Sequence, residues 1–221
     1  MSKNADEIHK LRAELREAVE GWTSLTADEW ERGGVLFQPM EFAKGDLLTR
    51  AGEPSRHIFF LCSGLTRMFY SLENGKEMNK SFAWEGLFVS GSLGDAGRAS
   101  EYGIQALEDT TAMAAGLPEI GALMAEGGGW TRLRDLYLGS LAERKARRER
   151  QLLVESAEER YRTFLTDFPH ISGRLPQYQI ALYLGITEVA LSRIKKRMFG
   201  GRISARCSRI ETAEYLSGCR W

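Results

Sequence analysis

The stretch QIALYLGITEVALSRIKK, residues 179–196, carries two short helical patterns with a break between them. On either side of the break, apolar residues recur at the spacing of a helix: Ile180, Leu184, Leu191 and Ile194. In the break, Gly185 favours the left-handed conformation that ends many helices, and Thr187 can accept a backbone N–H as the N-cap of a second helix. The stretch therefore predicts two short helices that meet at a tight corner.

The same stretch fits the offsets of a helix-turn-helix, which needs a small residue where its helices cross and a glycine in its turn. Ala181 and Gly185 fill these two roles, and apolar residues occupy the positions of the small core between the helices: Ile180, Leu184, Ile186, Leu191 and Ile194. A plain antiparallel helix pair is the alternative. On the helix-turn-helix interpretation, the outward residues of the second helix and its surroundings form a DNA-reading surface: Thr187, Glu188, Val189, Ser192, Arg193, Lys195, Lys196 and Arg197.

Side chains of these types can read a major groove. Arg193 can fork onto guanine, Glu188 can accept from cytosine, Val189 can touch a thymine methyl group, and the lysines can meet phosphates. The 221-residue chain has 30 basic and 30 acidic residues, but 11 basic and 6 acidic residues follow Ser156, so this tail carries +5 and residues 1–156 carry −5. Such a charge asymmetry between two parts of a chain indicates a nucleic-acid-binding segment attached to something else.

The chain before this tail begins with helical patterns and then becomes strand-like. Residues 5–20 carry an apolar helical face, and TADE at 26–29 reads as a capping box that opens a second helix. From residue 35 to about residue 115, runs such as HIFFLC, LTRMFYSL and EMNKSFAW alternate with turn residues, and Asn74-Gly75 predicts a two-residue hairpin turn. This spacing of short strands predicts an antiparallel sandwich or barrel.

Residues 130–154 predict one long helix with a charged middle, and SAEE at 156–159 reads as a capping box for a further helix that runs to Phe168. The long helix either packs on its own domain with a solvated face or forms a dimeric coiled coil, which its narrow apolar stripe favours. The apolar members of this helix are Leu133, Leu136, Tyr137, Leu141, Leu152 and Leu153.

Four stretches together resemble the CRP/FNR family of bacterial transcription regulators: KGDLLTRAGEPSRHIFFLCSGLTRMFY, YGIQALEDT, ESAEERYRTFL and LPQYQIALYLGITEVALSRIKKR. The resemblance covers nearly all of residues 35–200. It implies an α+β protein with a jelly-roll-like antiparallel β-roll sensor domain and N-terminal helices at 1–129, a dimerisation helix and hinge at 130–155, and a winged helix-turn-helix DNA-binding domain at 156–221. It also implies a homodimer that binds double-stranded DNA with an inverted-repeat site and works with RNA polymerase.

The chain departs from that family where cyclic nucleotides bind. Cyclic-nucleotide-binding members hold the ribose with Gly-Glu and the phosphate with Arg-Ser or Arg-Thr, whereas this chain has Ser90-Gly91 and Ser100-Glu101 at the corresponding places. The resemblance therefore implies an effector other than a cyclic nucleotide. Six residues are candidates for lining its pocket, with the arginine as a displaced anion ligand: Phe82, Trp84, Phe88, Arg98, Tyr102 and Tyr137.

The remaining features point to few other chemistries. The cysteines at 62, 207 and 219 lack a metal-binding spacing and the N-terminal cluster of iron–sulfur members, so we expect reduced thiols, with Cys62 in the core, and no resident cofactor. His57 and His170 are isolated, and no catalytic set is recognisable, so we do not expect an enzyme.

The charged N-terminus and the lack of a long apolar run predict a cytoplasmic protein without a membrane span. A ligand-binding or scaffold protein of this fold that has lost DNA binding stays open, because Glu188 and Val189 are an unusual pair on the reading helix and residues 200–221 fit a wing poorly.

Overall fold

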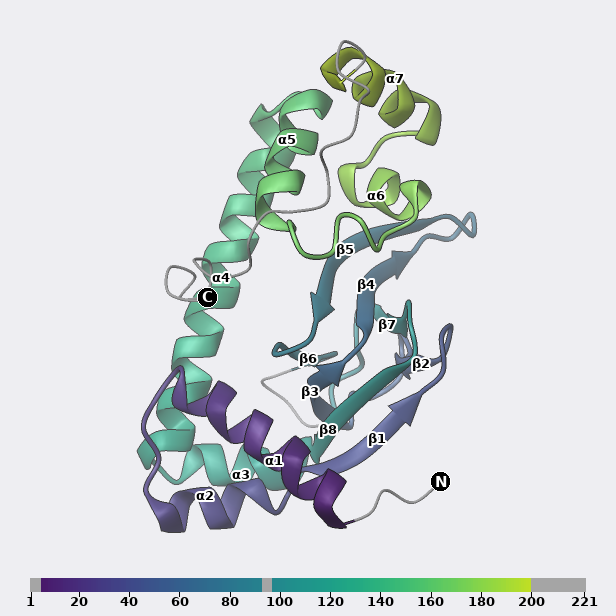
Figure 1. Ribbon diagram of the computed structural model, residues 1–221. Helices are drawn as coiled ribbons and strands as arrows, with labels where there is room; N and C mark the ends of the chain where they lie inside the picture. Colours follow the sequence, from purple (N-terminus) through teal and green to yellow (C-terminus); the bar gives the residue numbers. More distant parts are fainter. Residues whose placement is uncertain (1–4, 93–96, 200–221) are drawn as a thin grey trace. The chain divides into compact units, whose positions relative to one another are not determined.

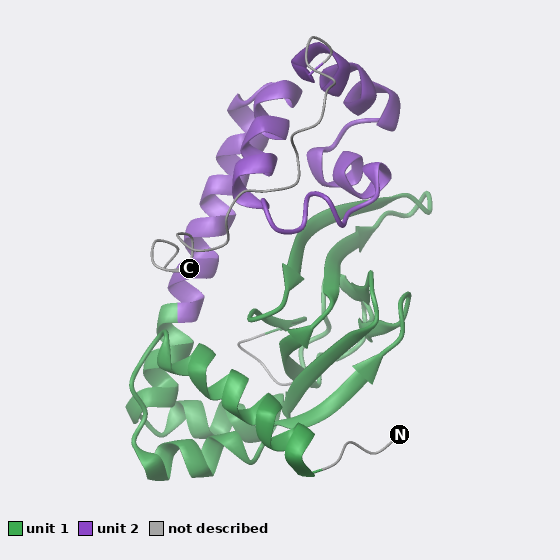
Figure 2. Cartoon of the chain, viewed as in Figure 1, with its two compact units in different colours: residues 1–136 green, residues 137–221 purple. Residues whose placement is uncertain are grey.

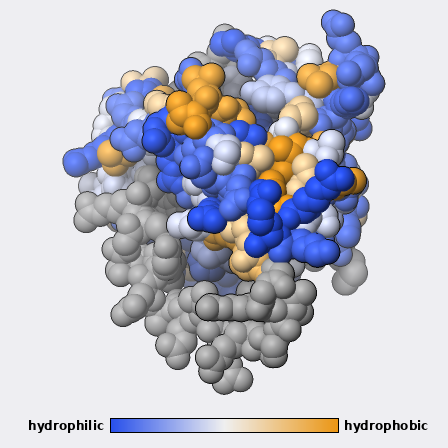
Figure 3. Space-filling view, turned by 90° about the horizontal axis from the view of Figure 1, so that it is seen from above, coloured by the Kyte–Doolittle hydropathy of each residue, from blue (hydrophilic) through white to orange (hydrophobic). Residues whose placement is uncertain are grey.

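The structure, a computed structural model, describes residues 5–92 and 97–199. The chain divides into two compact units, residues 1–136 and 137–221, and the division falls inside one long helix (Figure 2). The predicted wing at 200–221, with Cys207 and Cys219, lies outside the described residues. Within the described part of the chain, no helix is long and apolar enough to cross a membrane, and Figure 3 shows one face of the molecule coloured by hydropathy.

The first unit contains two four-stranded antiparallel sheets, with the strand orders β1-β8-β3-β6 and β2-β7-β4-β5 (Figure 1). This arrangement confirms the predicted antiparallel β-fold. The strands are β1 (Gln38–Phe42), β2 (Leu47–Thr49), β3 (His57–Ser63), β4 (Leu65–Ser71), β5 (Glu77–Trp84), β6 (Phe88–Ser90), β7 (Gly103–Ala106) and β8 (Thr110–Gly116).

The turn between β4 and β5 differs from the prediction of a two-residue loop. The N–H of Leu72 donates to the carbonyl of Lys76 (2.8 Å), so the paired strands extend past their assigned ends and three residues, 73–75, make the loop. Gly75 has a φ of 77°, as the last residue of such a three-residue hairpin requires. The glycine was correctly predicted to make the turn, but the prediction of the loop length was wrong.

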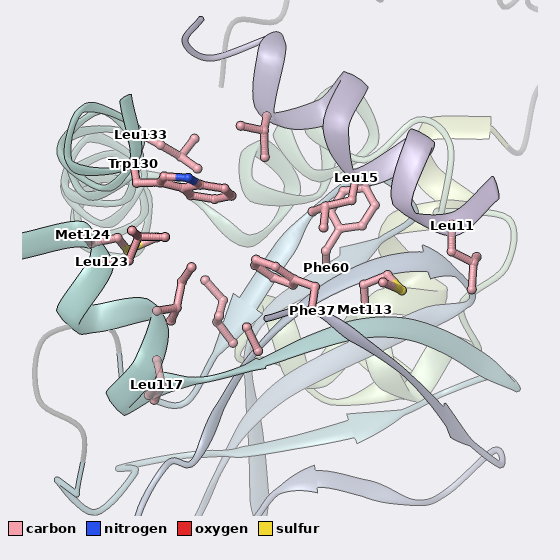
Figure 4. Packing of buried hydrophobic residues seen from close by; sticks show 14 residues of the cluster. Leu11, Leu15, Phe37, Phe60, Met113, Leu117, Leu123, Met124, Trp130 and Leu133 are labelled. Atoms are coloured by element: carbon pink, nitrogen blue, oxygen red, sulfur yellow. The ribbon is translucent and has the colours of Figure 1, made fainter. Parts of the chain in front are cut away.

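Helices α1 (Ala5–Glu20), α2 (Ala27–Gly34), α3 (Leu117–Ala125) and the start of α4 (Gly128–Val154) gather beside the sheets (Figure 1). Thr26 and Glu29 form the predicted capping box of α2. The core between helices and sheet combines residues from α1, the strands and α4, and Figure 4 shows their close packing. Its buried members include Leu11, Leu15, Phe37, Phe60, Met113, Ile120, Trp130 and Leu133. A second cluster lies among the strands and includes Phe59, Leu61, Ala83, Val89 and Ile104.

Glu29 connects α2 to the first turn of α4. Its carboxylate accepts the N–H groups of Gly129 (2.7 Å) and Thr26 (2.8 Å), and these hydrogen bonds lower the pKa of Glu29 below its ordinary value. The indole N–H of Trp130 donates to the carbonyl of Glu29 (2.7 Å). A Cβ on Gly33 would lie only 2.2 Å from the Trp130 ring, so this glycine allows the helix and the ring to pack closely.

The second unit begins with the rest of α4, followed by α5 (Ala157–Asp167), α6 (Gln177–Leu184) and α7 (Glu188–Phe199). Ser156 and Glu159 form the predicted capping box of α5. An aromatic cluster joins α5 to α6: Tyr161, Phe164, Phe168 and Tyr183. The order of the helices matches the prediction, and α6 and α7 occupy the stretch that predicted two helices with a corner.

Candidate nucleic-acid interface and effector region

A three-residue turn joins α6 to α7, as the sequence predicts. Gly185 has φ 71° and ψ 34°, in the left-handed region, and its N–H donates to the carbonyl of Ala181. The Thr187 hydroxyl accepts the N–H of Ala190 (3.2 Å), which is the expected cap of α7. The predicted core positions are buried, apart from the half-buried Ile186: Ile180, Ala181, Leu184, Leu191 and Ile194. These contacts hold α6 and α7 together as two helices joined by a tight turn.

The outward side of α7 carries the residues predicted to read DNA. Six of the eight are exposed and are not in the core between the helices: Thr187, Glu188, Val189, Ser192, Arg193 and Lys196. Lys195 is half-buried, and Arg197 is exposed but ion-paired. The outer side of α7 and its N-cap therefore present two exposed arginines, of which Arg197 is ion-paired, together with one exposed lysine, one carboxylate, two hydroxyl groups and an apolar side chain.

Arg197 is held by an acidic residue of α5. Its guanidinium contacts the carboxylate of Glu158 at 2.6 and 2.8 Å, and Glu158 also accepts a hydrogen bond from Arg162 (2.8 Å). The hydrogen bond from Arg197 is the main reason that the pKa of Glu158 lies below its ordinary value. Arg197 was predicted to be a nearby DNA contact, and no local sequence pattern indicates this ion pair because the two residues are 39 positions apart.

Two arginines meet the C-terminal end of α6. Arg148, from α4, donates to the carbonyl of Tyr183, and its guanidinium carbon lies 3.9 Å from the centre of the Tyr183 ring. Arg160, from α5, donates to the carbonyl of Leu184 (3.2 Å) and to that of Glu155 (2.6 Å). These guanidinium groups satisfy carbonyls that a helix end leaves unpaired, directly before the turn at Gly185. Burial lowers the pKa of Arg148 and raises that of Tyr183.

In the first unit, Ser90 and Ser100 lie in the loop region, at the two places where the family's cyclic-nucleotide ligands were expected. The buried Ser90 hydroxyl lies within hydrogen-bond distance of the backbone carbonyls of Ser92 (2.8 Å) and His57 (3.0 Å), and its single O–H can donate to either of them. The buried Ser100 hydroxyl donates to the carbonyl of Tyr102 (2.7 Å), while the Tyr102 hydroxyl donates to the carbonyl of Ser90 (2.7 Å). These hydrogen bonds tie both ends of the loop to each other.

Gly91, next to Ser90, packs tightly in this loop. A Cβ at this position would lie 2.7 Å from the Ser100 hydroxyl and 2.8 Å from the Thr49 methyl group. Arg98 is exposed and forms an ion pair with Glu101 (3.2 Å). The described part of the loop therefore offers buried hydroxyl groups, and its charged groups are at the surface.

Residues 39–126 match the family described as "Cyclic nucleotide-binding domain". The matched segment begins in β1 and ends just after α3, so it includes both sheets. This segment has the fold of a cyclic nucleotide-binding domain. A comparison with curated proteins found no match for the chain.

Solved structures share the fold of the cyclic nucleotide-binding domain and of further parts of the chain. FixK2 from Bradyrhizobium japonicum is 19% identical, with a TM-score of 0.67 over 77% of this chain and 90% of its own. The c-di-GMP-responsive global regulator CLP from Xanthomonas campestris is 15% identical, with a TM-score of 0.67 over 82% and 96%. A structure from Eubacterium rectale, described as a transcriptional regulator of the crp/fnr family, is 16% identical, with a TM-score of 0.63 over 81% and 88%. At these identities, the likeness establishes the fold alone.

The aromatic residues predicted to line an effector pocket belong to different parts of the cyclic nucleotide-binding domain and beyond. Phe88 packs with Phe37 and Phe60 against the helical core, whereas Tyr102 packs against the cluster among the strands. Phe82 is buried and Trp84 half-buried, both on β5. Tyr137 lies in the second unit, where burial raises its pKa. Cys62, expected in the core, is half-buried and packs at the edge of the helical core.

Two cations of the cyclic nucleotide-binding domain were not singled out from the sequence. Arg67 is buried, forms an ion pair with Glu77 (2.5 Å) and donates to the side chains of Gln105 and Asn79. Lys80 lies with its ammonium group 3.5 Å from the centre of the Tyr102 ring. No local pattern marks Lys80, because Tyr102 reaches it from another strand region. Among the described residues, no group of three or more His, Cys, Asp or Glu side chains could hold a metal ion.

Proposed function

We propose that this chain is a sequence-specific DNA-binding transcription regulator that acts as a homodimer on an inverted-repeat site. The observation that carries the proposal is the pair of helices α6 and α7, with the left-handed Gly185, the Thr187 cap and an exposed, partly basic outer face on α7. In a helix-turn-helix, the second helix enters the major groove with its N-terminal residues at the base edges. The fold shared with structures described as transcription regulators supports the same conclusion.

The proposal assigns different tasks to Arg193 and Lys196. Arg193 is exposed on the second turn of α7, where its planar guanidinium can donate twice to one guanine. Lys196 lies near the end of α7, where a point charge can meet a phosphate. Arg197 is less available for a phosphate contact than the sequence suggested, because its charge is already paired with that of Glu158.

A binding assay with two single variants tests this assignment. Wild-type protein, Arg193→Ala and Lys196→Ala are titrated by fluorescence anisotropy against DNA from the protein's own upstream region and against a scrambled duplex, at several salt concentrations. Arg193→Ala should lose about 1–3 kcal/mol on the specific site, with little change on the scrambled duplex. Lys196→Ala should weaken both duplexes alike and reduce the salt dependence by about one phosphate contact. A wild-type protein with equal affinity for both duplexes would support the alternative, a protein of this fold that has lost specific DNA binding.

We also propose that the cyclic nucleotide-binding domain responds to an effector other than a cyclic nucleotide. An anionic phosphate that enters a protein loses its water, and charge-assisted hydrogen bonds must replace that hydration. At the expected phosphate position, Ser100 is neutral and already bonded within the protein, and Glu101 adds a negative charge. Gly91 supplies no carboxylate for a ribose hydroxyl, and its surroundings leave no space for one. Small molecules retained by the purified protein, identified by mass spectrometry, would name the effector.

A further inference from the structure

We propose that Arg148 is a positioning residue that fixes the helix-turn-helix at a set angle to α4. The proposal rests on the proposed function, because the orientation of α7 matters only if α7 binds DNA. The structural role of Arg148 can nevertheless be tested without DNA. All of the groups involved belong to the second unit. Arg148 reaches from α4 to Tyr183 in the last turn of α6, two positions before the inter-helix turn begins at Gly185.

The contact of Arg148 with Tyr183 has two parts. One guanidinium nitrogen donates to the Tyr183 carbonyl, at the end of α6 where the helix dipole favours a positive charge. The guanidinium carbon lies over the Tyr183 ring, 3.9 Å from the ring centre, as in a cation–π contact. The other guanidinium end faces the side-chain oxygen of Gln151 on α4 (3.4 Å). A planar group held at three points has little rotational freedom, so it transmits the orientation of α4 to α6.

Tyr183 carries this constraint into the rest of the helix-turn-helix. Its ring is buried and contacts Phe164 and Phe168, with ring centres 5.6 and 5.4 Å away. Arg160 holds the next carbonyl of α6, that of Leu184. Arg160 comes from α5, which already packs on α6, so it stabilises the helical bundle from within. Arg148 differs because it joins this bundle to the long helix that enters from the first unit.

The neighbouring Arg147 provides a matched control. It also reaches from α4 to α5, by an ion pair with Asp167, but its side chain is 56% exposed. Exposed ion pairs restrain a structure weakly because water and salt screen them. The two single variants Arg148→Met and Arg147→Met therefore each remove one guanidinium group, from adjacent positions. Only Arg148→Met also removes a contact with a ring and a hydrogen bond to a helix end.

The experiment measures the distance between α4 and α7 by pulsed electron paramagnetic resonance. Spin labels are attached at Glu143→Cys and Ser192→Cys, two exposed positions, in a full-length chain with its natural cysteines replaced by serine. Labelled protein is diluted with unlabelled protein so that only distances within one chain contribute. We expect Arg148→Met to broaden the distance distribution at least twofold and Arg147→Met to leave it unchanged. If Arg148→Met retains the wild-type distribution, or if both variants broaden it equally, the proposal is wrong.

Two further measurements complete the test. If circular dichroism shows that Arg148→Met has lost helix, Arg148→Lys replaces it, because lysine keeps the charge but lacks the planar group that stacks on the ring. An unchanged distribution in Arg148→Lys then overturns the proposal, and a broadened one supports it. For DNA, Arg148→Met should bind the specific site about tenfold more weakly than Arg147→Met, since α7 must be oriented on binding. A wild-type protein that binds no specific DNA refutes the proposed function, whereas the distance measurement still decides the role of Arg148.

Discussion

Gly91 shows how one small residue shapes the loop of the cyclic nucleotide-binding domain. Thr49, which is distant in sequence, and Ser100, nine residues further along the chain, both lie closer than van der Waals contact to the place where a side chain would begin. Both neighbours are buried, so neither can move aside into solvent. The position that would carry a ribose-binding carboxylate is therefore filled by the protein itself.

We predict that Gly91→Ala lowers the free energy of unfolding by about 1–3 kcal/mol, because its methyl group overpacks a filled space. Gly121→Ala is the control, since a Cβ there meets nothing within 4 Å and alanine is the better helix former within α3. Urea denaturation followed by circular dichroism gives both values. Equal stability of the two variants would mean that the loop around Gly91 yields without cost.

The roles that could be predicted from the sequence are those in which a residue acts on its near neighbours along the chain. Gly185 and Thr187 act on backbone groups within a few positions, so their roles follow from the order of residues alone. The reason for a glycine at 91, the ion pair of Glu158 with Arg197 and the approach of Lys80 to Tyr102 depend on segments brought together by folding. The local order of residues does not indicate which distant segments come into contact, so these three roles could not be predicted.

At the scale of elements, α4 combines two different faces. Leu133 is buried in the helical core of the first unit and is 4% exposed. Another side of the same helix presents exposed small and apolar residues at helical spacing: Leu138, Gly139, Ala142, Ala146, Leu152 and Leu153. Small residues allow two helix backbones to approach closely, so this side suits the partner helix of the proposed homodimer.

We predict that the double variant Leu138→Glu and Ala142→Glu is a monomer, because it places four like charges in the proposed seam of two α4 helices. Sedimentation velocity measures the mass. Leu136→Glu is the control, since Leu136 is 42% exposed and Leu138 is 39% exposed, but the two residues lie on different sides of the helix. A control that dissociates while the double variant remains dimeric would move the interface to the side of Leu136.

The periodicity of α4 correctly predicted a long helix, but it could not assign its apolar residues to partners. The predicted stripe contained both Leu133, which its own unit buries, and Leu153, which is 76% exposed. Leucines on opposite sides of α4 have the same hydrophobicity. Only their packing partners in the folded protein show that Leu133 is buried and Leu153 is not. The strands were predictable for a similar reason, since alternating runs and turn glycines are local, whereas the order of strands in each sheet was not.

At the scale of the whole molecule, acidic and basic residues are distributed unequally along the chain. The acidic part of the sequence forms the cyclic nucleotide-binding domain and most of α4, and the basic excess follows Ser156. The charge of residues 1–156, at −5, opposes an anionic ligand as well as DNA. The residues of the loop and the net charge of residues 1–156 therefore both favour an effector that is not an anionic cyclic nucleotide.

We predict that neither cyclic AMP nor cyclic GMP binds with a Kd below about 1 mM, which corresponds to about 4 kcal/mol. Isothermal titration calorimetry with the full-length protein measures this directly, and a regulator known to bind cyclic AMP confirms the activity of the ligand stock. Micromolar binding that also tightens DNA binding would contradict the prediction. Arg98→Ala and Lys80→Ala would then show which cation holds the phosphate.

The joint between α2 and α4 has a consequence for how this protein can be divided. The family match begins at residue 39, yet Phe37, Leu15 and Trp130 belong to the same core as the strands. A fragment cut at the limits of the match would leave this apolar side of the sheet uncovered and would be prone to aggregate. The segment matched by the family is thus smaller than the unit that could be transplanted or fused as an independent module.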